Sequence, residues 1–288
     1  MGLIICVASA FCWSCFDLAR KLSLKKISPE SILIIFSLFQ ILIFSFWLFF
    51  FDFSFQLKDY FFVGILLVLI NVISALFFLN SLKISELSMT IPLLSFTPLF
   101  SAIFSYFLID EKLKIFQYLG IFFIIFGTMI LYSKSLKISE IFRSITVLKN
   151  NTAAKYMLSV SVMWSITPIL DKICLQSASI NIHGLIQAFG MLIFLIFIHK
   201  KKIKKEIFLF KKEYKLILIT MLIGVGATIL QFLAILTSLV SIMESVKRTM
   251  GQFGSLYFGR FFFNEKISSQ KVLGIFLLSF GIFFILNY

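Results

Sequence analysis

The chain has 288 residues, of which 60% are hydrophobic and only 14% are charged. Soluble domains average about 25% charged residues, so this composition excludes an ordinary soluble domain and indicates a protein that crosses a membrane many times. The formal net charge of +14 comes largely from lysines between apolar runs, which is the topology signal of a membrane protein and argues against a nucleic-acid partner.

Ten apolar runs are long enough to cross the hydrocarbon core, which takes roughly 20 residues of helix. The connections are short except for two basic segments, 134–154 and 199–214. We therefore predict an all-α polytopic membrane protein with about ten transmembrane helices, no soluble domain and no cofactor. The predicted spans are Gly2–Leu22, Ser31–Phe51, Tyr60–Leu82, Ser88–Ile109, Ile115–Ser133, Lys155–Gln176, Asn181–His199, Lys215–Leu239, Ser241–Phe263 and Ser269–Asn287.

Asp17 lies inside the first predicted span, with Arg20 and Lys21 three and four residues further on. This helical spacing places the three side chains on one face, so the carboxylate can be neutralised locally. Charges inside a bilayer are costly and usually face a bundle interior or a water-filled cavity. We therefore predict that Asp17 lines a cavity.

Prolines interrupt two predicted spans: Pro92 and Pro98 lie in the fourth and Pro168 in the sixth. Each removes a backbone donor and frees a carbonyl, which is tolerated at membrane depth where protein or a cavity satisfies it. Thr90 is a candidate for the lining of a polar path, although a helix–helix hydrogen bond explains it equally well.

Other polar residues of the second half give weaker signals. Asp171 and Lys172 lie one turn before the end of the sixth span, where an interfacial pair is as good an explanation as a site. His183 and His199 are isolated, with no partner at metal-ligand spacing, and we predict no metal site.

The ninth span carries the most informative polar residues of the chain. Glu244, Lys247 and Arg248 share one helical face, in the order that favours an ion-paired cluster. Gly251 and Gln252 continue this stripe with a small and a polar side chain. An alternative is that the two basic residues lie at the helix end and snorkel to the headgroups. The apolar residues ahead of them favour a position inside the membrane.

The chain repeats itself. The motif LGIFFIIFG at Leu119–Gly127 returns as LGIFLLSFG at Leu273–Gly281, and Glu111-Lys112 returns as Glu265-Lys266 in the same register. Each half holds about five spans, and an odd number makes the two halves insert with opposite orientation. This is the inverted-repeat plan of many secondary transporters, whose site lies at the repeat interface near the midplane. The resulting division is a first five-helix repeat at 1–135, a basic linker at 136–153 and a second five-helix repeat at 154–288.

Three features recur in both halves: a tryptophan in the first helix, a glutamate after the fourth and a glycine pair in the fifth. These residues are Trp13, Trp164, Glu111, Glu265, Gly120, Gly127, Gly274 and Gly281. The pattern covers almost the whole chain and resembles the drug/metabolite transporter superfamily in its ten-helix EamA-type form. The resemblance implies that helices 1, 3, 4, 6, 8 and 9 surround a central cavity, which opens alternately to the two sides.

A weaker similarity, at Lys247-Arg248, is to the phosphate translocators and nucleotide-sugar transporters of the same superfamily. Those relatives place a Lys-Arg or Lys-Thr pair in the ninth helix, and in phosphate translocators the pair holds the phosphate. This chain departs from them because the predicted span Ser88–Ile109 contains no lysine, so a phosphate site would be incomplete.

The sequence therefore predicts a secondary transporter, not an enzyme, that moves a small metabolite bearing an anionic group by alternating access. Export of amino acids or amphiphilic compounds is one alternative, and a membrane scaffold or subunit is the other. The expected partners are a small-molecule substrate and the lipid bilayer, with a homodimer left open. Predicted substrate-binding residues are Lys247, Arg248, Glu244, Gln252, Asp17, Trp13, Trp164 and Thr90. Predicted gating or structural residues are Glu111, Glu265, Pro92, Pro98, Pro168 and Gly251.

Basic residues are distributed unevenly between the two sets of loops. Loops after even-numbered spans hold Lys58, Lys112 and Lys114, whereas loops after odd-numbered spans hold many more, among them Lys25, Lys26, Lys83, Lys137, Arg143, Lys202 and Lys266. Short loops rich in Lys and Arg stay in the cytoplasm, so the charges predict that both termini are outside. EamA-type transporters usually have both termini inside; we follow the charges. We expect an integral multi-pass protein of a bacterial inner (plasma) membrane.

Overall fold

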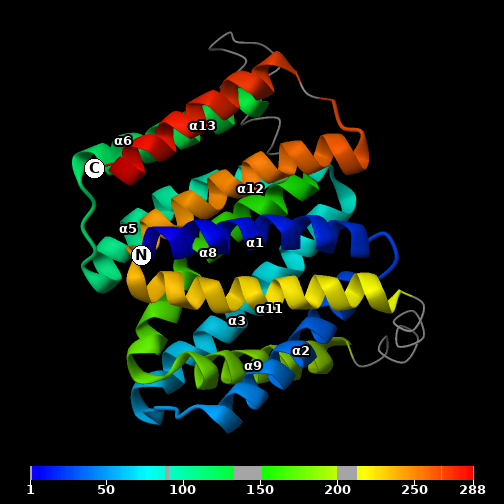
Figure 1. Ribbon diagram of the computed structural model, residues 1–288, viewed down its shortest axis with the longest axis vertical. Coiled ribbons are helices and arrows are strands. Elements are labelled where there is room, and N and C mark those ends of the chain that lie inside the picture. Colours follow the sequence, from blue (N-terminus) through cyan, green and yellow to red (C-terminus); the bar gives the residue numbers. More distant parts are fainter. Residues whose placement is uncertain (1, 88–90, 133–150, 200–212, 267, 288) are drawn as a thin grey trace.

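The computed structural model describes residues 2–87, 91–132, 151–199, 213–266 and 268–287. Within these residues the chain forms ten α-helices and one 3₁₀-helix, with no β-sheet, which confirms the predicted fold class (Figure 1). The elements are α1 (Gly2–Ser23), α2 (Pro29–Phe50), α3 (Leu57–Ile84), η1 (Ile91–Phe96), α5 (Thr97–Ile109), α6 (Ile115–Tyr132), α8 (Thr152–Ser177), α9 (Ile180–His199), α11 (Tyr214–Thr237), α12 (Val240–Phe263) and α13 (Ser269–Asn287).

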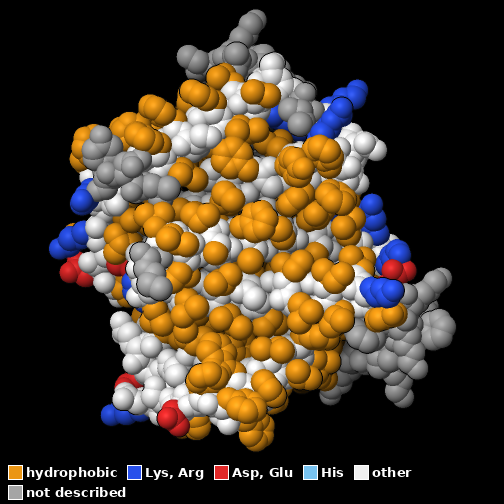
Figure 2. Space-filling model, in the orientation of Figure 1, with side chains coloured by type: hydrophobic (Ala, Val, Ile, Leu, Met, Phe, Trp, Pro, Cys, Tyr) orange, Lys and Arg blue, Asp and Glu red, His pale blue; other side chains and the backbone are white. Residues whose placement is uncertain are grey.

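Most of the described helices have the length or composition of membrane spans. Six of them (α1, α2, α3, α8, α9 and α11) are long and apolar enough to cross a membrane, and the fourth, fifth and tenth spans contain shorter apolar helices. α12 has 24 residues but includes several charged ones, so it needs a polar interior to face. Large hydrophobic side chains cover the exposed surface, and Figure 2 shows the charged residues mainly at its left and right flanks.

Helix ends follow local sequence signals. Ser28 caps the N-terminus of α2 by accepting a hydrogen bond from the N–H three residues on, and Pro29 occupies the first turn. α5 and α12 end alike, on Asp110 and Asn264, whose φ angles are 52° and 54°. Asp and Asn tolerate this left-handed conformation better than other residues with a side chain.

The fourth span differs from its predicted form. The sequence predicts one helix over Ser88–Ile109, whereas the described part consists of η1 followed by α5. Pro98 lies in the first turn of α5, where its missing N–H leaves no helical bond unmade. In a continuous helix its ring would collide with the carbonyl of Leu94, so the α-helix begins anew beside the proline.

α6 and α13, the fifth helices of the two halves, lie side by side (Figure 1). A Cβ added to Gly120 would lie 2.6 Å from the carbonyl oxygen of Gly281, and one added to Gly281 would lie 2.7 Å from that of Gly120. Gly127 meets the carbonyl of Gly274 in the same way, at 2.9 Å. The paired glycines therefore let the two backbones touch, at positions exchanged between the halves.

The helix contacts of one half recur, exchanged, in the other. α1 packs against α11 and α12, and α8 correspondingly packs against α3 and α5. α2 packs on α9 and α6 on α13, so equivalent helices also pair with each other. This exchange is that of a pseudo-two-fold axis, and five spans per half place the axis in the membrane plane. The halves are inverted repeats, and the start of α1 and the end of α13 lie at the same end of the bundle (Figure 1).

Candidate functional site

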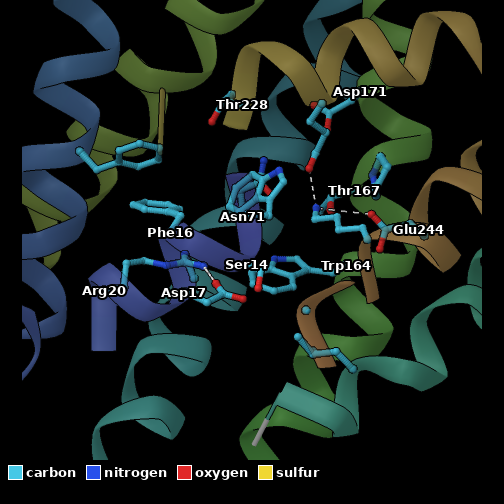
Figure 3. Close-up of a pocket in the computed structure, with 18 of the residues that line it drawn as sticks. Ser14, Phe16, Asp17, Arg20, Asn71, Trp164, Thr167, Asp171, Thr228 and Glu244 are labelled. Atoms are coloured by element: carbon cyan, nitrogen blue, oxygen red, sulfur yellow. Dashed lines mark hydrogen bonds and ion pairs between the residues drawn. The ribbon is translucent and has the colours of Figure 1, made fainter. Parts of the chain in front are cut away.

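A cavity of about 140 Å³ lies at the centre of the bundle and is lined by residues of both halves (Figure 3). The resemblance implies a lining from the first, third, fourth, sixth, eighth and ninth spans. The structure adds residues of the second span (α2) and of the seventh span (α9). The fourth span contributes through η1. The charged lining residues are Asp17, Arg20, Asp171, Glu244, Lys247 and Arg248. Ser14, Gln40, Asn71, Thr167, Gln187, Thr228 and Gln231 add polar groups.

The α12 cluster (Glu244, Lys247 and Arg248) forms an ion triad inside the bundle. Glu244 is fully buried, and its Oε2 accepts hydrogen bonds from Arg248 Nε at 3.0 Å and Nη2 at 2.7 Å. Lys247 Nζ lies 3.5 Å from the other carboxylate oxygen and also donates to Oε1 of Gln231 on α11. The lysine and arginine side chains are only 10% and 6% exposed. They face the cavity, and snorkelling to the headgroups does not describe them.

Two tryptophans at equivalent positions of the halves cover these cations. The Trp13 ring centroid lies 4.4 Å from Lys247 Nζ, and the Trp164 centroid lies 5.2 Å from the guanidinium carbon of Arg248. Both distances are within cation–π range. Trp164 Nε1 donates to Ser74 Oγ at 3.0 Å, whereas the buried Nε1 of Trp13 has no hydrogen-bond partner in the described structure. The Trp13 indole therefore holds a buried N–H donor that the described residues leave without an acceptor.

Asp17 is neutralised on its own helix, as the sequence predicts. It forms an ion pair with Arg20 (Figure 3). The guanidinium carbon lies 4.2 Å and 4.4 Å from the ring centroids of Phe16 and Phe78, so the aromatic rings and the carboxylate together compensate its burial. Lys21, the other predicted partner, instead donates to the backbone carbonyls of Leu82, in the last turn of α3, and of Ser85, directly after it.

The formal charges around the cavity balance. Its three carboxylates are those of Asp17, Asp171 and Glu244, and its three cations are Arg20, Lys247 and Arg248. A low-dielectric cavity that holds a net charge is costly unless the charge is compensated, so this balance stabilises the structure with no ligand bound. A bound molecule must then either carry both signs of charge or be accompanied by a counter-ion.

Two residues that the sequence does not connect meet beside the cavity. Asp171 Oδ1 on α8 lies 3.0 Å from His183 Nε2 on α9. From the sequence we interpret Asp171 and Lys172 either as an interfacial pair or as part of a site, and His183 as isolated; in the structure Asp171 lines the cavity. Lys172 instead pairs with Glu111. The aspartate–histidine contact has no helical spacing that could signal it, because it forms across the turn between two helices.

Some of the remaining predicted site residues line the cavity, and others do not. Pro168 and Gly251 line the cavity, whereas Pro98 does not. Gln252, a predicted substrate contact, is fully buried away from the cavity and donates to Ser95 of η1 and to Thr128 of α6, at 3.5 Å for the latter. Thr90 lies outside the described residues. Pro92 lies in η1, but its side chain is not among those described.

Glu111 and Glu265 lie at opposite ends of the bundle and make equivalent contacts. Glu111 follows α5, and its Oε2 accepts a hydrogen bond from the N–H of Val240 at the start of α12, at 2.9 Å. Glu265 follows α12, and its Oε1 accepts from the N–H of Leu87, ahead of η1, at 3.1 Å. Each glutamate thus ties the end of the fourth span of its own half to the start of the fourth span of the other half.

A lysine from the first helix of each half reinforces these contacts. Lys172 Nζ lies 2.6 Å from Glu111 Oε1 and donates to the carbonyl of Ser238 at 3.2 Å. Lys21, at the equivalent position of α1, donates to the carbonyls of Leu82 and Ser85 at the other end. We call these two contact sets the Glu111 latch (Glu111, Lys172, Ser238 and Val240) and the Glu265 latch (Glu265, Lys21, Leu82, Ser85 and Leu87).

The comparisons with known proteins agree with this architecture. The model of the EamA-like transporter family matches residues 1–133 and 151–287, one match in each half of the chain. A solved crystal structure, described only as that of a protein, superposes with a TM-score of 0.71 over 99% of this chain and 98% of its own. The two sequences are 14% identical, so this likeness shows the shared fold alone. The search of curated proteins gives no match.

Proposed function

Because the chain belongs to the EamA-like transporter family, we propose that it is a secondary transporter that moves a small metabolite bearing an anionic group by alternating access. The observation that carries the proposal is the α12 cluster, which places two cations in a cavity between the inverted repeats. Intramembrane ionisable residues that face such a cavity commonly handle ions or charged substrates.

Lys247 is the cation best placed to receive an anion. Arg248 already gives two hydrogen bonds to Glu244, whereas the ammonium of Lys247 is 3.5 Å from the nearer carboxylate oxygen. Among the described residues, this ammonium also contacts the Trp13 ring and the amide oxygen of Gln231, neither of which carries a charge. An anionic group that approaches from the cavity would therefore complete the coordination of this lysine.

The size and charge of the cavity favour a small, charge-balanced molecule. Ligand pockets for drug-sized molecules are roughly 300–1,000 Å³, and about 140 Å³ is well below that range. This volume favours a small metabolite over a large amphiphile. The equal number of carboxylates and cations favours a zwitterion, so transport of amino acids is the second candidate function.

The latches supply a mechanism for alternating access. Each glutamate joins the fourth span of one half to the fourth span of the other, and in the Glu111 latch Lys172 adds the first helix of the second half. The two latches lie at opposite ends of the bundle. Breaking one latch while the other holds would open the cavity to one side only, which is what a transport cycle requires. We assign Glu111 and Glu265 to gating on this basis.

The test is uptake into proteoliposomes that contain the purified protein. The probes are a ¹⁴C-labelled L-amino acid mixture, [¹⁴C]succinate and [¹⁴C]glycerol 3-phosphate, which separate zwitterions, carboxylates and phosphates. We expect uptake of at least one probe, and a loss of about tenfold or more in Lys247→Ala and Arg248→Ala, the change that follows from losing one charge-assisted bond. Lys112→Ala is the matched control, because its side chain is 68% exposed at the bundle end. Normal uptake by both cavity variants would remove the site assignment.

A further inference from the structure

A buried hydrogen-bonded network connects two residues of the cavity lining, Asp171 and Gln187, through His183 and Tyr60. The imidazole is fully buried on α9, with Nε2 3.0 Å from Asp171 Oδ1 and Nδ1 2.8 Å from the hydroxyl of Tyr60 on α3. The Tyr60 oxygen in turn accepts a hydrogen bond from Gln187 Nε2 at 3.0 Å. Asp171 and Gln187 both line the cavity, so each end of the network meets whatever the cavity contains.

The donors and acceptors assign the protons in this arrangement. Gln187 donates to the Tyr60 oxygen, so the tyrosine's own hydrogen is directed to Nδ1 of His183. The imidazole then carries its single hydrogen on Nε2 and donates it to the carboxylate of Asp171. The network is satisfied with a neutral imidazole and an ionised aspartate, and it has room for one more proton.

We infer that the Asp171–His183 pair is a proton-binding site that couples transport to a proton gradient. The inference rests on the proposed function, since it supplies the coupling ion of the same cavity. One proton from a hydronium ion in the cavity passes through the network to His183 Nδ1, so that one O–H bond of the hydronium breaks and this N–H bond forms. The imidazolium then donates to both Asp171 and Tyr60. The proton leaves by the reverse step when the cavity opens to the other side.

Proton binding is relayed to the cavity through the tyrosine. Once Nδ1 carries a hydrogen, the Tyr60 hydroxyl must direct its own hydrogen to another acceptor. Gln187 Oε1 is buried and has no hydrogen-bond partner in the described structure, and its amide already touches the tyrosine. Rotation of that amide presents the oxygen to Tyr60 and gives up the hydrogen bond that Nε2 also donates to the carbonyl of Gly64, at 3.2 Å. The protonation state of His183 therefore sets which face of Gln187 the cavity presents.

The charges around the site give the coupling its sign. Asp171 faces, across the cavity, the ionised residues of α1 (Asp17 and Arg20) and of α12 (Glu244, Lys247 and Arg248). Around His183, α8 also contributes the buried thiol of Cys174 in the cluster that holds Tyr60, and α11 contributes the ring of Phe232 at 4.9 Å. The lining is formally neutral, so an added proton leaves it with a net positive charge. Linkage then requires that the proton and an anion bind more tightly together than alone, which is the behaviour of a symporter.

The first arm of the test observes the proton directly and needs no substrate. The sequence contains only two histidines, His183 and His199, so a His199→Gln variant labelled with ¹⁵N-histidine gives the imidazole signals of His183 alone. We expect these signals to change from a neutral to a charged imidazole between about pH 8 and pH 5. The midpoint should move in Asp171→Asn. A single protonation state over this whole range would overturn the inference.

The second arm measures coupling with whichever of [¹⁴C]succinate, [¹⁴C]glycerol 3-phosphate or the ¹⁴C-amino acid mixture the proteoliposomes take up. An acidic exterior should raise uptake by roughly fivefold or more in the wild type, the lower end of coupling between linked sites. His183→Gln and the more conservative Tyr60→Phe should lose this response, while both keep exchange of internal for external probe at equal pH. Uptake that ignores the pH gradient would overturn the proton site and leave the transporter intact. If no probe enters, the proposed function fails, and this inference with it.

Discussion

The α12 cluster shows how buried ions constrain a membrane protein at the level of single residues. Glu244 has no solvent exposure and depends on Arg248 and Lys247 for compensation. A buried ion pair adds little net stability, because desolvation consumes most of the Coulomb gain, but the loss of one partner leaves an uncompensated charge. Stability therefore does not explain the cluster, which supports the role that we propose for it in the cavity.

The burial of Glu244 beside its two cations predicts how variants of the α12 cluster unfold. Glu244→Ala should lower the free energy of unfolding by about 3–5 kcal/mol, the usual cost of breaking a buried pair, and Glu244→Met combined with Arg248→Met should recover much of that loss. SDS titration in mixed micelles measures both. Lys112→Ala, which removes an exposed pair with Asp110, should change stability by less than about 1 kcal/mol. A double variant as unstable as Glu244→Ala would contradict the argument.

Helical spacing within one span can be read from the sequence, but contacts between spans cannot. The positions three and four residues after Glu244 predict the triad correctly, because they share a face of any regular helix. The same stripe places Gln252 with the cluster, yet its amide turns to Ser95 and Thr128, because the packing of η1 and α6 closes the cavity above it. Asp171 and His183 meet only through the angle at which α8 and α9 pack, which no periodicity encodes.

At the scale of helices, the limits of the spans follow from hydropathy to within a few residues. Each span must bury about the same hydrocarbon thickness, so apolar length alone locates it. The fourth span is the exception, since Pro98 forces a break whose form, a 3₁₀-helix over Ile91–Phe96, depends on tertiary packing. The contact between α6 and α13, in contrast, is predictable from the sequence. Small residues duplicated in both halves indicate that two backbones approach closely.

The glycine contacts predict a difference between two alanine substitutions. Gly120→Ala should destabilise the protein by about 1–3 kcal/mol, because the added Cβ meets a backbone oxygen that cannot move aside. Gly226→Ala in α11 meets no atom within 4 Å and should be neutral or up to about 1 kcal/mol more stable, through its better helix propensity. Thermal unfolding in detergent ranks the two variants. Equal midpoints would mean that α6 and α13 pack less closely than described.

At the scale of the whole molecule, a symmetric scaffold carries an asymmetric site. The latches and the tryptophans occur in both halves, whereas the cations of α12 do not. In the register of the repeat, Lys247 and Arg248 correspond to Leu93 and Leu94, which are buried and apolar. In the transport cycle that we propose, the symmetric parts serve the two equivalent openings of alternating access, and the asymmetric part serves a substrate that has no symmetry itself.

The latches predict opposite effects of two equivalent substitutions. Glu111→Gln removes the ion pair with Lys172 and should favour opening at the end that carries the α5–α6 loop; Glu265→Gln should favour opening at the other end. The reporter is Thr167→Cys on the cavity wall, with the native cysteines replaced, labelled by an impermeant maleimide in intact cells and in inside-out vesicles. We expect each variant to increase labelling several-fold from one side only. An increase from the same side in both variants would contradict the gating assignment.

The same two ends of the bundle decide the orientation in the membrane. The loops after the odd-numbered spans, one of which carries Lys26, hold most of the loop lysines and arginines in the sequence, and such loops stay in the cytoplasm. Lys26 and Lys112 lie at opposite ends, and their side chains are 51% and 68% exposed, which makes them a matched pair of reporters. In bacterial cells that express cysteine-replaced protein, Lys112→Cys should react with an impermeant maleimide at once, and Lys26→Cys only after permeabilisation. The reverse result would place both termini in the cytoplasm. In that case the basic loops would face outward, and the rule that fixes orientation in most membrane proteins would be overruled here by the insertion of the helices themselves.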